Sequence, residues 1–145
     1  MAHSATPSPV LLDLERIVVA SVGITARALG EVAPELTLVQ WRALVLVDVA
    51  APIAVGSLAA ALDAKIAAVS RLVGRLRAKG LVETRRDAVD GRLVLVVLTE
   101  RGRELRHQVV ERRREDLATA IKVAALPPDA RDVVAGLAAV LEGVA

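Results

Sequence analysis

Apolar residues recur at spacings of three and four along several long segments, which is the pattern of amphipathic helices. A β-branched apolar run over residues 93–98 is instead typical of a strand, and an extended segment over 81–84 precedes it. The polar residues between them contain Asp90-Gly91, a strong signal for a hairpin turn. We therefore predict a two-stranded hairpin and six helices, the latter over residues 10–29, 38–49, 55–62, 66–79, about 100–124, and from about 128 onward.

Single residues mark where these helices begin and end. Thr37 followed three residues later by Gln40 forms a capping box, and Thr99 is placed to cap the long helix. Gly30 and Gly80 are expected to end the helices that precede them. Two short helices joined by a brief turn, the second rich in arginine, and then a hairpin predict a winged helix-turn-helix.

The helix over residues 66–79 has two chemically different faces. Its apolar face, which we expect to lie on the core, consists of Ile66, Val69, Leu72, Val73 and Leu76. The opposite face centres on Ala67, Arg71, Gly74 and Ala78, with Ser70 and Arg75 beside it. Small side chains let a helix backbone approach another surface, and arginine donates two parallel hydrogen bonds to guanine or phosphate. This face predicts a helix that enters the DNA major groove; the alternative is a plain surface helix of high helix propensity.

The predicted hairpin is also basic. Arg85, Arg86 and Arg92 lie near its turn, with Asp87 and Asp90 close by. An arginine on a projecting loop fits the narrow minor groove, where the negative potential is high, and a carboxylate is able to hold the guanidinium in place. The alternative is a surface hairpin with local ion pairs of little energy.

The composition leaves a surplus of apolar surface to cover. Of the 145 residues 54% are apolar, and the absence of cysteine excludes a disulfide framework or a cysteine nucleophile. The best candidate for a membrane span, residues 43–62, contains Asp48 and Pro52, and residues 1–9 hold no basic segment before an apolar stretch. We therefore expect a cytoplasmic protein that does not cross a membrane and that buries its apolar surface in a homodimer.

Charge is distributed unevenly along the chain. Residues 64–114 contain 14 Lys and Arg against 6 Asp and Glu, a charge of +8, while the remainder carries −6. A basic middle between apolar, acidic ends favours a polyanion as partner.

The segment from residue 36 to 105 resembles the MarR family of bacterial transcriptional regulators. The most specific matches are Asp87-x-x-Asp90-x-Arg92 in the hairpin and Leu98-Thr99-x-x-Gly102 after it. The other matching motifs cover residues 36–41, 55–59 and 69–82. The resemblance implies a mainly α protein with a small β-hairpin wing, which is a winged helix-turn-helix with N- and C-terminal dimerisation helices. It divides the chain into a flexible tail over 1–9 and one domain of the HTH marR type over 10–145, with dimerisation helices at 10–34 and 100–145 and the winged helix-turn-helix at 36–99.

The resemblance also implies a function. A homodimer would bind double-stranded DNA at a palindromic operator, as a repressor or, less often, an activator. Ser70, Arg71 and Arg75 would face the major groove, and Arg92 would enter the minor groove with Asp90 as its brace. The other candidate DNA-binding residues are Lys65, Ala67, Ala68, Arg85 and Arg86. The family often has Ser or Thr where this chain has Ala67 and Ala68.

Regulation is left open by the sequence. In the mechanism we expect, an effector in the cleft between the dimer and winged-helix regions would favour a spacing of recognition helices other than the ~34 Å of successive major grooves. The effector is either a small apolar or anionic molecule or absent altogether. We predict no cofactor and no resident metal.

Rival functions rest on weaker features. A helical dimeric adaptor that binds protein instead of DNA is the main alternative, and binding that is indifferent to salt would favour it. An enzyme lacks a nucleophile beside a base. Glu104, His107 and Glu111 share a helix face and offer metal ligands, but a solvated face is the simpler interpretation. Trp41 is interpreted as a packing residue, with ligand stacking as the alternative.

Overall fold

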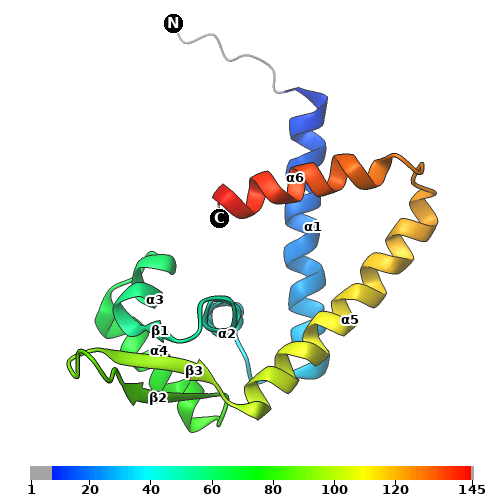
Figure 1. Ribbon diagram of the computed structural model, residues 1–145. Helices are drawn as coiled ribbons and strands as arrows, with labels where there is room; N and C mark the ends of the chain where they lie inside the picture. The colour runs from blue at the N-terminus through cyan, green and yellow to red at the C-terminus, as the bar shows by residue number, and fades with distance from the viewer. Residues whose placement is uncertain (1–7, 145) are drawn as a thin grey trace, which may run out of the picture. The chain divides into compact units, whose positions relative to one another are not determined.

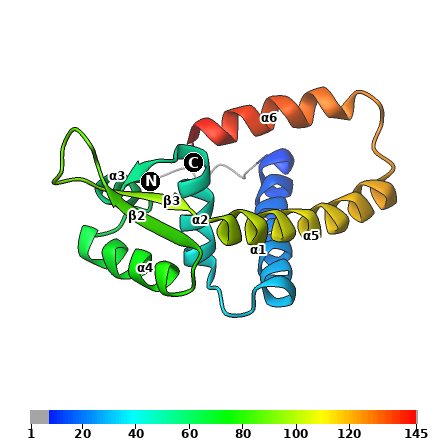
Figure 2. The same ribbon diagram turned by 60° about the horizontal axis from the view of Figure 1, so that its bottom comes forward.

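The structure is a computed structural model that describes residues 8–144, with side chains through Leu141. Within this range it contains six helices and a three-stranded sheet (Figures 1 and 2). The helices are α1 (Pro9–Val32), α2 (Leu38–Ala50), α3 (Val55–Ala61), α4 (Ile66–Ala78), α5 (Glu100–Ala124) and α6 (Ala130–Val144). The strands are β1 (Ile53–Ala54), β2 (Val82–Arg86) and β3 (Val94–Leu98). The chain forms two compact units, one up to Arg113 and one from Arg114.

The mainly α architecture with a hairpin is confirmed, but the sheet contains a strand that the sequence did not predict. β3 lies between β1 and β2, and both pairings are antiparallel. β1 has only two residues, with Ile53 opposite Val96, so it is too short for an alternating pattern to reveal. The loop between β2 and β3 projects from the end of the sheet away from α5 (Figures 1 and 2).

A core of aliphatic side chains holds α2, α3, α4 and the sheet together. Its largest fully buried side chains are Leu44, Val47, Leu58, Val69, Leu76, Leu81, Val82, Val96 and Val109. Trp41 is 5% exposed and belongs to the same cluster, so its indole is a packing group. Since this core is continuous from α2 to the start of α5, it fixes α4 and the hairpin relative to each other.

The helix ends follow the predicted signals with one exception. The capping box is present, since the Thr37 hydroxyl accepts from Gln40 N–H and the Gln40 side chain accepts from Thr37 N–H. Gly80 has φ +70°, and Leu81 N–H donates to the Leu76 carbonyl, which closes α4. Gly30, however, does not end α1, which continues to Val32.

Burial explains why α1 runs past Gly30. Ala28, Leu29 and Ala33 are all buried in the core cluster, and this packing outweighs the roughly 1 kcal/mol that glycine costs inside a helix. The predicted tail over residues 1–9 is described only at its end. Residues 1–7 lie outside the described residues, while Ser8 caps α1 through its side chain and Pro9 begins it.

The start of α4 has no side-chain cap. Its N-cap is Lys65, which makes no side-chain capping bond, and Asp63 does not supply one either. Asp63 instead adopts φ +48° and donates its N–H to the Ala60 carbonyl at the end of α3. A short polar side chain tolerates this left-handed conformation, so Asp63 ends one helix and does not begin the next.

The unit from Arg114 onward consists of the rest of α5 and α6. Pro127 and Pro128 separate the two helices, as predicted. Its large apolar side chains are mostly exposed, among them Ile121, Val123, Val133, Val134, Val140 and Leu141. Over the described residues, no helix combines the length and apolarity that crossing a bilayer needs.

At Gly102 the backbone of α5 comes very close to the segment that follows α4. A Cβ built on Gly102 would lie 2.1 Å from the Leu81 carbonyl oxygen, which is far inside van der Waals contact. The backbone of α5 therefore packs directly on the residue that follows α4 and Gly80.

Gly102→Ala is expected to destabilise the fold by roughly 1–3 kcal/mol, because α5 must move off Leu81 to admit the methyl group. Chemical denaturation monitored by circular dichroism measures the change. Gly74→Ala is the matched control, since its Cβ would meet nothing within 4 Å, and it is expected to stabilise by about 0.4–1 kcal/mol. Equal effects of the two substitutions would contradict the close-packing argument.

Candidate nucleic-acid interface

One side of α4 is buried and the other is open to solvent. Val69, Leu72, Val73 and Leu76 lie in the core as predicted. Ile66 does not, because its side chain is 60% exposed, and its assignment to the core face was wrong. Ile66 is the first residue of α4, where the helix has not yet come close to the core.

Every candidate DNA-binding residue is exposed. On α4 and its N-cap these are Lys65, Ala67, Ala68, Ser70, Arg71 and Arg75, and on the hairpin Arg85, Arg86, Asp90 and Arg92. Alanines and Gly74 leave the middle of the outer α4 face without large side chains, and a Cβ on Gly74 would meet open space. The backbone of α4 is thus accessible to a surface as large as a DNA groove.

The arginines on this face are available to a ligand. Across the described part of the chain, the side chains of Arg71 and Arg75 make no ion pair and no hydrogen bond, and the same holds for Arg85 and Arg92. A guanidinium group carries five donors in a planar fork, which suits phosphates and guanine edges. Four such groups make a strongly cationic surface, although Arg85 also lies close enough to Asp87 to help lower the pKa of that carboxyl.

The two acids of the hairpin loop were expected to hold guanidinium groups, but their carboxylates accept hydrogen bonds from the backbone instead. Asp87 Oδ1 accepts hydrogen bonds from the backbone N–H groups of Val89 and Asp90, at 2.9 and 2.8 Å. Asp90 Oδ1 accepts from the backbone N–H of Arg92 at 3.0 Å. Asp90 therefore fixes the main chain at Arg92 and leaves its guanidinium free.

These backbone bonds make the loop a defined structure. The Arg86 guanidinium donates to the Gly91 carbonyl at 2.7 Å, which ties the strand to the loop tip. Hydrogen bonds from Asp90 and Val89 N–H, in that order, hold the pKa of Asp87 below its ordinary value of 3.8. The Asp87 carboxylate, charged at neutral pH, thus helps to fix the loop backbone that carries Arg92.

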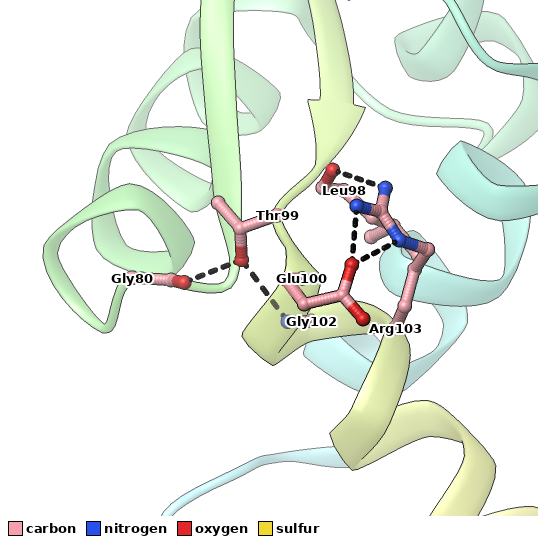
Figure 3. Close-up of polar contacts among 6 residues, drawn as sticks. All are labelled: Gly80, Leu98, Thr99, Glu100, Gly102 and Arg103. Atoms are coloured by element: carbon pink, nitrogen blue, oxygen red, sulfur yellow. Dashed lines mark hydrogen bonds and ion pairs between the residues drawn. The ribbon is translucent and has the colours of Figure 1, made fainter.

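Thr99 joins the segment that follows α4 to the start of α5, as Figure 3 shows. Its hydroxyl donates to the Gly80 carbonyl at 2.6 Å and accepts from Gly102 N–H at 3.0 Å. The second bond caps α5, which confirms the role predicted for Thr99. The first bond was not foreseen, because it spans 19 residues of sequence and local capping rules do not report it. Arg103 adds a bond to the Leu98 carbonyl at 3.0 Å and an ion pair with Glu100.

Two ion pairs attach the first half of α5 to the earlier helices. Arg106 pairs with Asp48 of α2 at 2.6 Å, and Arg112 pairs with Glu31 of α1. Both arginines are largely covered, with 25% and 26% of their side chains exposed. The pairs hold the winged helix, α1 and the start of α5 together as one body.

The predicted alternative metal ligands are engaged with neighbours on their own helix. Glu104 accepts a hydrogen bond from Gln108 at 2.8 Å, and His107 Nε2 lies 3.9 Å from a Glu111 carboxylate oxygen. Among the residues described, no group of three or more potential ligands gathers to hold a metal ion.

Comparison with known proteins finds one family and several solved structures. The model of the MarR family matches residues 35–93. The crystal structure of RV1404 from Mycobacterium tuberculosis is 30% identical, with 95% of each chain covered and a TM-score of 0.76. Wild-type MarR from Escherichia coli in its apo form is 26% identical over 96% of this chain and 98% of that one, with a TM-score of 0.70. A probable transcriptional regulator from Pseudomonas aeruginosa is 27% identical over 88% and 95%, with a TM-score of 0.60. No curated protein sequence matches the chain.

The Asp87 carboxyl is expected to titrate below pH 3.8, the ordinary value, because the folded loop hydrogen-bonds to its charged form. A depressed pKa means that the loop's stabilisation is present above the ordinary value and is lost as pH falls through the folded one. Carbon-detected NMR of the carboxyl group measures the midpoint. Asp87→Ala is expected to speed amide exchange at Val89 and Asp90, whereas Asp87→Asn, which keeps one acceptor oxygen, is expected to speed it less. A midpoint at or above 3.8 would contradict the assignment.

Proposed function

Because the chain belongs to the MarR family of transcriptional regulators, we propose that it binds double-stranded DNA as a homodimer and regulates transcription from a palindromic operator. Members of this family are regulators and not enzymes. The observation that carries the proposal is the exposed face of α4, where Arg71 and Arg75 have no partner in the described chain and lie beside the small residues Ala67, Gly74 and Ala78. Major-groove reading needs such a face.

The wing supports the same function at a second groove. Arg92 is exposed at the projecting loop, and its backbone is fixed by Asp90. Minor grooves attract arginine because of their concentrated negative potential. Ser70, Arg71 and Arg75 then serve the major groove, with Lys65, Ala67, Ala68, Arg85 and Arg86 along the contact.

Exposed apolar helices support the homodimer. Along α1 the exposed large side chains are Val10, Leu11, Leu12, Ile17, Val18, Val19 and Val22. Those of the unit from Arg114 onward are exposed as well. A monomer rarely leaves such continuous apolar surface in water. We assign residues 36–99 to DNA binding and 10–34 and 100–145 to dimerisation, within one domain over 10–145.

The finer parts of the proposal concern regulation. A repressor acts by occupying its operator, and a small apolar or anionic effector would release it by favouring a dimer whose recognition helices no longer match successive major grooves. Such a regulator works in the cytoplasm, where bacterial DNA is.

Selection of bound duplexes from a random pool tests the proposal. The expected product is a palindrome with half-sites about one helical turn apart, since each protomer reads one half. Binding should weaken steeply with salt, with a log–log slope near −0.9 for each phosphate neutralised. Failure to enrich any duplex, or association with a protein partner that is indifferent to salt, would overturn the proposal in favour of an adaptor.

Arg71→Ala and Arg92→Ala are expected to differ in what they remove. Arg71→Ala should cost about 1–3 kcal/mol on the selected operator and less on random duplex, because a base contact carries sequence information. Arg92→Ala should weaken binding by a similar amount while the dimer stays intact. Gel-shift titration on both duplexes, with size-exclusion chromatography for the dimer, makes the comparison. Equal losses on operator and random duplex would show that Arg71 contacts phosphate, and wild-type affinity of Arg92→Ala would refute the wing assignment.

A further inference from the structure

A hollow of about 530 Å³ lies between α4 and the wing, and the start of α3 forms a further wall. Its polar lining comes from both sides, with Ser70 and Arg77 on α4, Thr84 on β2 and Arg92 on the loop. Ile66 and Leu93 contribute apolar surface. All the lining residues belong to the described chain, and none of them is acidic. The hollow is therefore cationic, open and amphipathic.

The geometry of duplex DNA indicates which part of the DNA would lie at this hollow. In the proposed function, on which this inference rests, α4 occupies the major groove and the wing the adjacent minor groove. One sugar–phosphate strand separates two neighbouring grooves. That strand must run between α4 and the wing, which is where the hollow lies.

Arg77 is the cation best held for such a strand. Its Nη1 lies 3.3 Å from the Thr84 hydroxyl oxygen, so the guanidinium bridges from α4 toward β2. This bond uses one of five donors and leaves the others for a ligand. Arg77 makes no ion pair among the described residues, whereas Lys79, two residues on, donates to the Glu35 carbonyl.

The spacing of the α4 residues agrees with this position. Ser70, Gly74 and Arg77 recur at intervals of four and three, which places them along one edge of the helix, beside the outer face of Arg71 and Arg75. Gly74 opens this edge, since no atom lies within 4 Å of a Cβ built there. Ile66 begins the same edge, and its 60% exposure gives the deoxyribose an apolar surface to contact.

We propose that the hollow between α4 and the wing is a binding site for the DNA backbone, in which Arg77 binds a phosphate and Thr84 positions its guanidinium. The phosphate is not read for sequence, so this contact sets the register of the protein on the duplex and leaves base recognition to other residues. In this arrangement α4 and the wing both contact the sugar–phosphate strand that lies between them.

Arg77→Gln tests the site by its salt dependence. The log–log slope of binding against salt is expected to be about 0.9 less steep per protomer than that of the wild type, and affinity to fall roughly tenfold on operator and random duplex alike. Lys79→Gln, the matched control, removes the same charge from the end of the same helix and is expected to leave the slope at its wild-type value. Circular dichroism melting confirms that both variants fold.

Two further variants separate charge from position. Arg77→Lys keeps the cation and is expected to restore most of the slope, since lysine binds phosphate as a point charge. Thr84→Val is expected to weaken binding in the wild-type background and to add nothing to Arg77→Gln, because the hydroxyl acts only through Arg77. A change of base preference in Arg77→Gln would overturn the proposal by making Arg77 a base reader.

A neutral methylphosphonate placed at each backbone position of the operator locates the contact. One position per half-site, between the major-groove contacts and the wing's minor groove, is expected to weaken the wild type roughly tenfold and to leave Arg77→Gln unaffected. Operator binding by the wild type with an unchanged slope in Arg77→Gln would overturn this site alone. Absence of duplex binding by the wild type would overturn the proposed function itself.

Discussion

The contact on which the rest of the structure depends is the seating of Gly102 on the Leu81 carbonyl. Any side chain at residue 102 would occupy space that a backbone oxygen already fills. Thr99 reinforces the contact, because its hydroxyl bonds the Gly80 carbonyl on one side and the Gly102 N–H on the other (Figure 3). The end of α4 and the start of α5 therefore form one joint.

The joint depends on residues that are widely separated in the sequence, namely Gly80, Thr99 and Gly102. Gly80 must adopt a positive φ to end α4, and only then does Leu81 turn its carbonyl toward α5. Thr99 and Gly102 are spaced by three because one turn of helix brings the cap hydroxyl to the third N–H. Arg106 with Asp48 and Arg112 with Glu31 extend the attachment along α5.

The sequence predicted those features that local rules govern. The capping box at Thr37, the stop at Gly80 and the buried stripe of α4 from Val69 to Leu76 all depend on residues a few positions apart. It failed where distant packing decides, as at Gly30, where buried neighbours carry α1 onward, and at β1, which exists only because β3 lies beside it. Asp90 shows the same limit. The sequence places this acid near Arg92, but it does not show that the carboxylate accepts from the backbone N–H and not from the guanidinium.

The 13-residue helix α4 presents three edges with different surroundings. Val69, Leu72 and Leu76 face the core, Arg71 and Arg75 face outward, and Ser70, Gly74 and Arg77 face the wing. A helix with 3.6 residues per turn separates these sets without any special sequence device. Core packing and the DNA contacts that we propose are thus assigned to different side chains of the same element. A substitution on one edge is therefore expected to change mainly the contacts that this edge makes, provided that the joint at Gly102 keeps the helix in place.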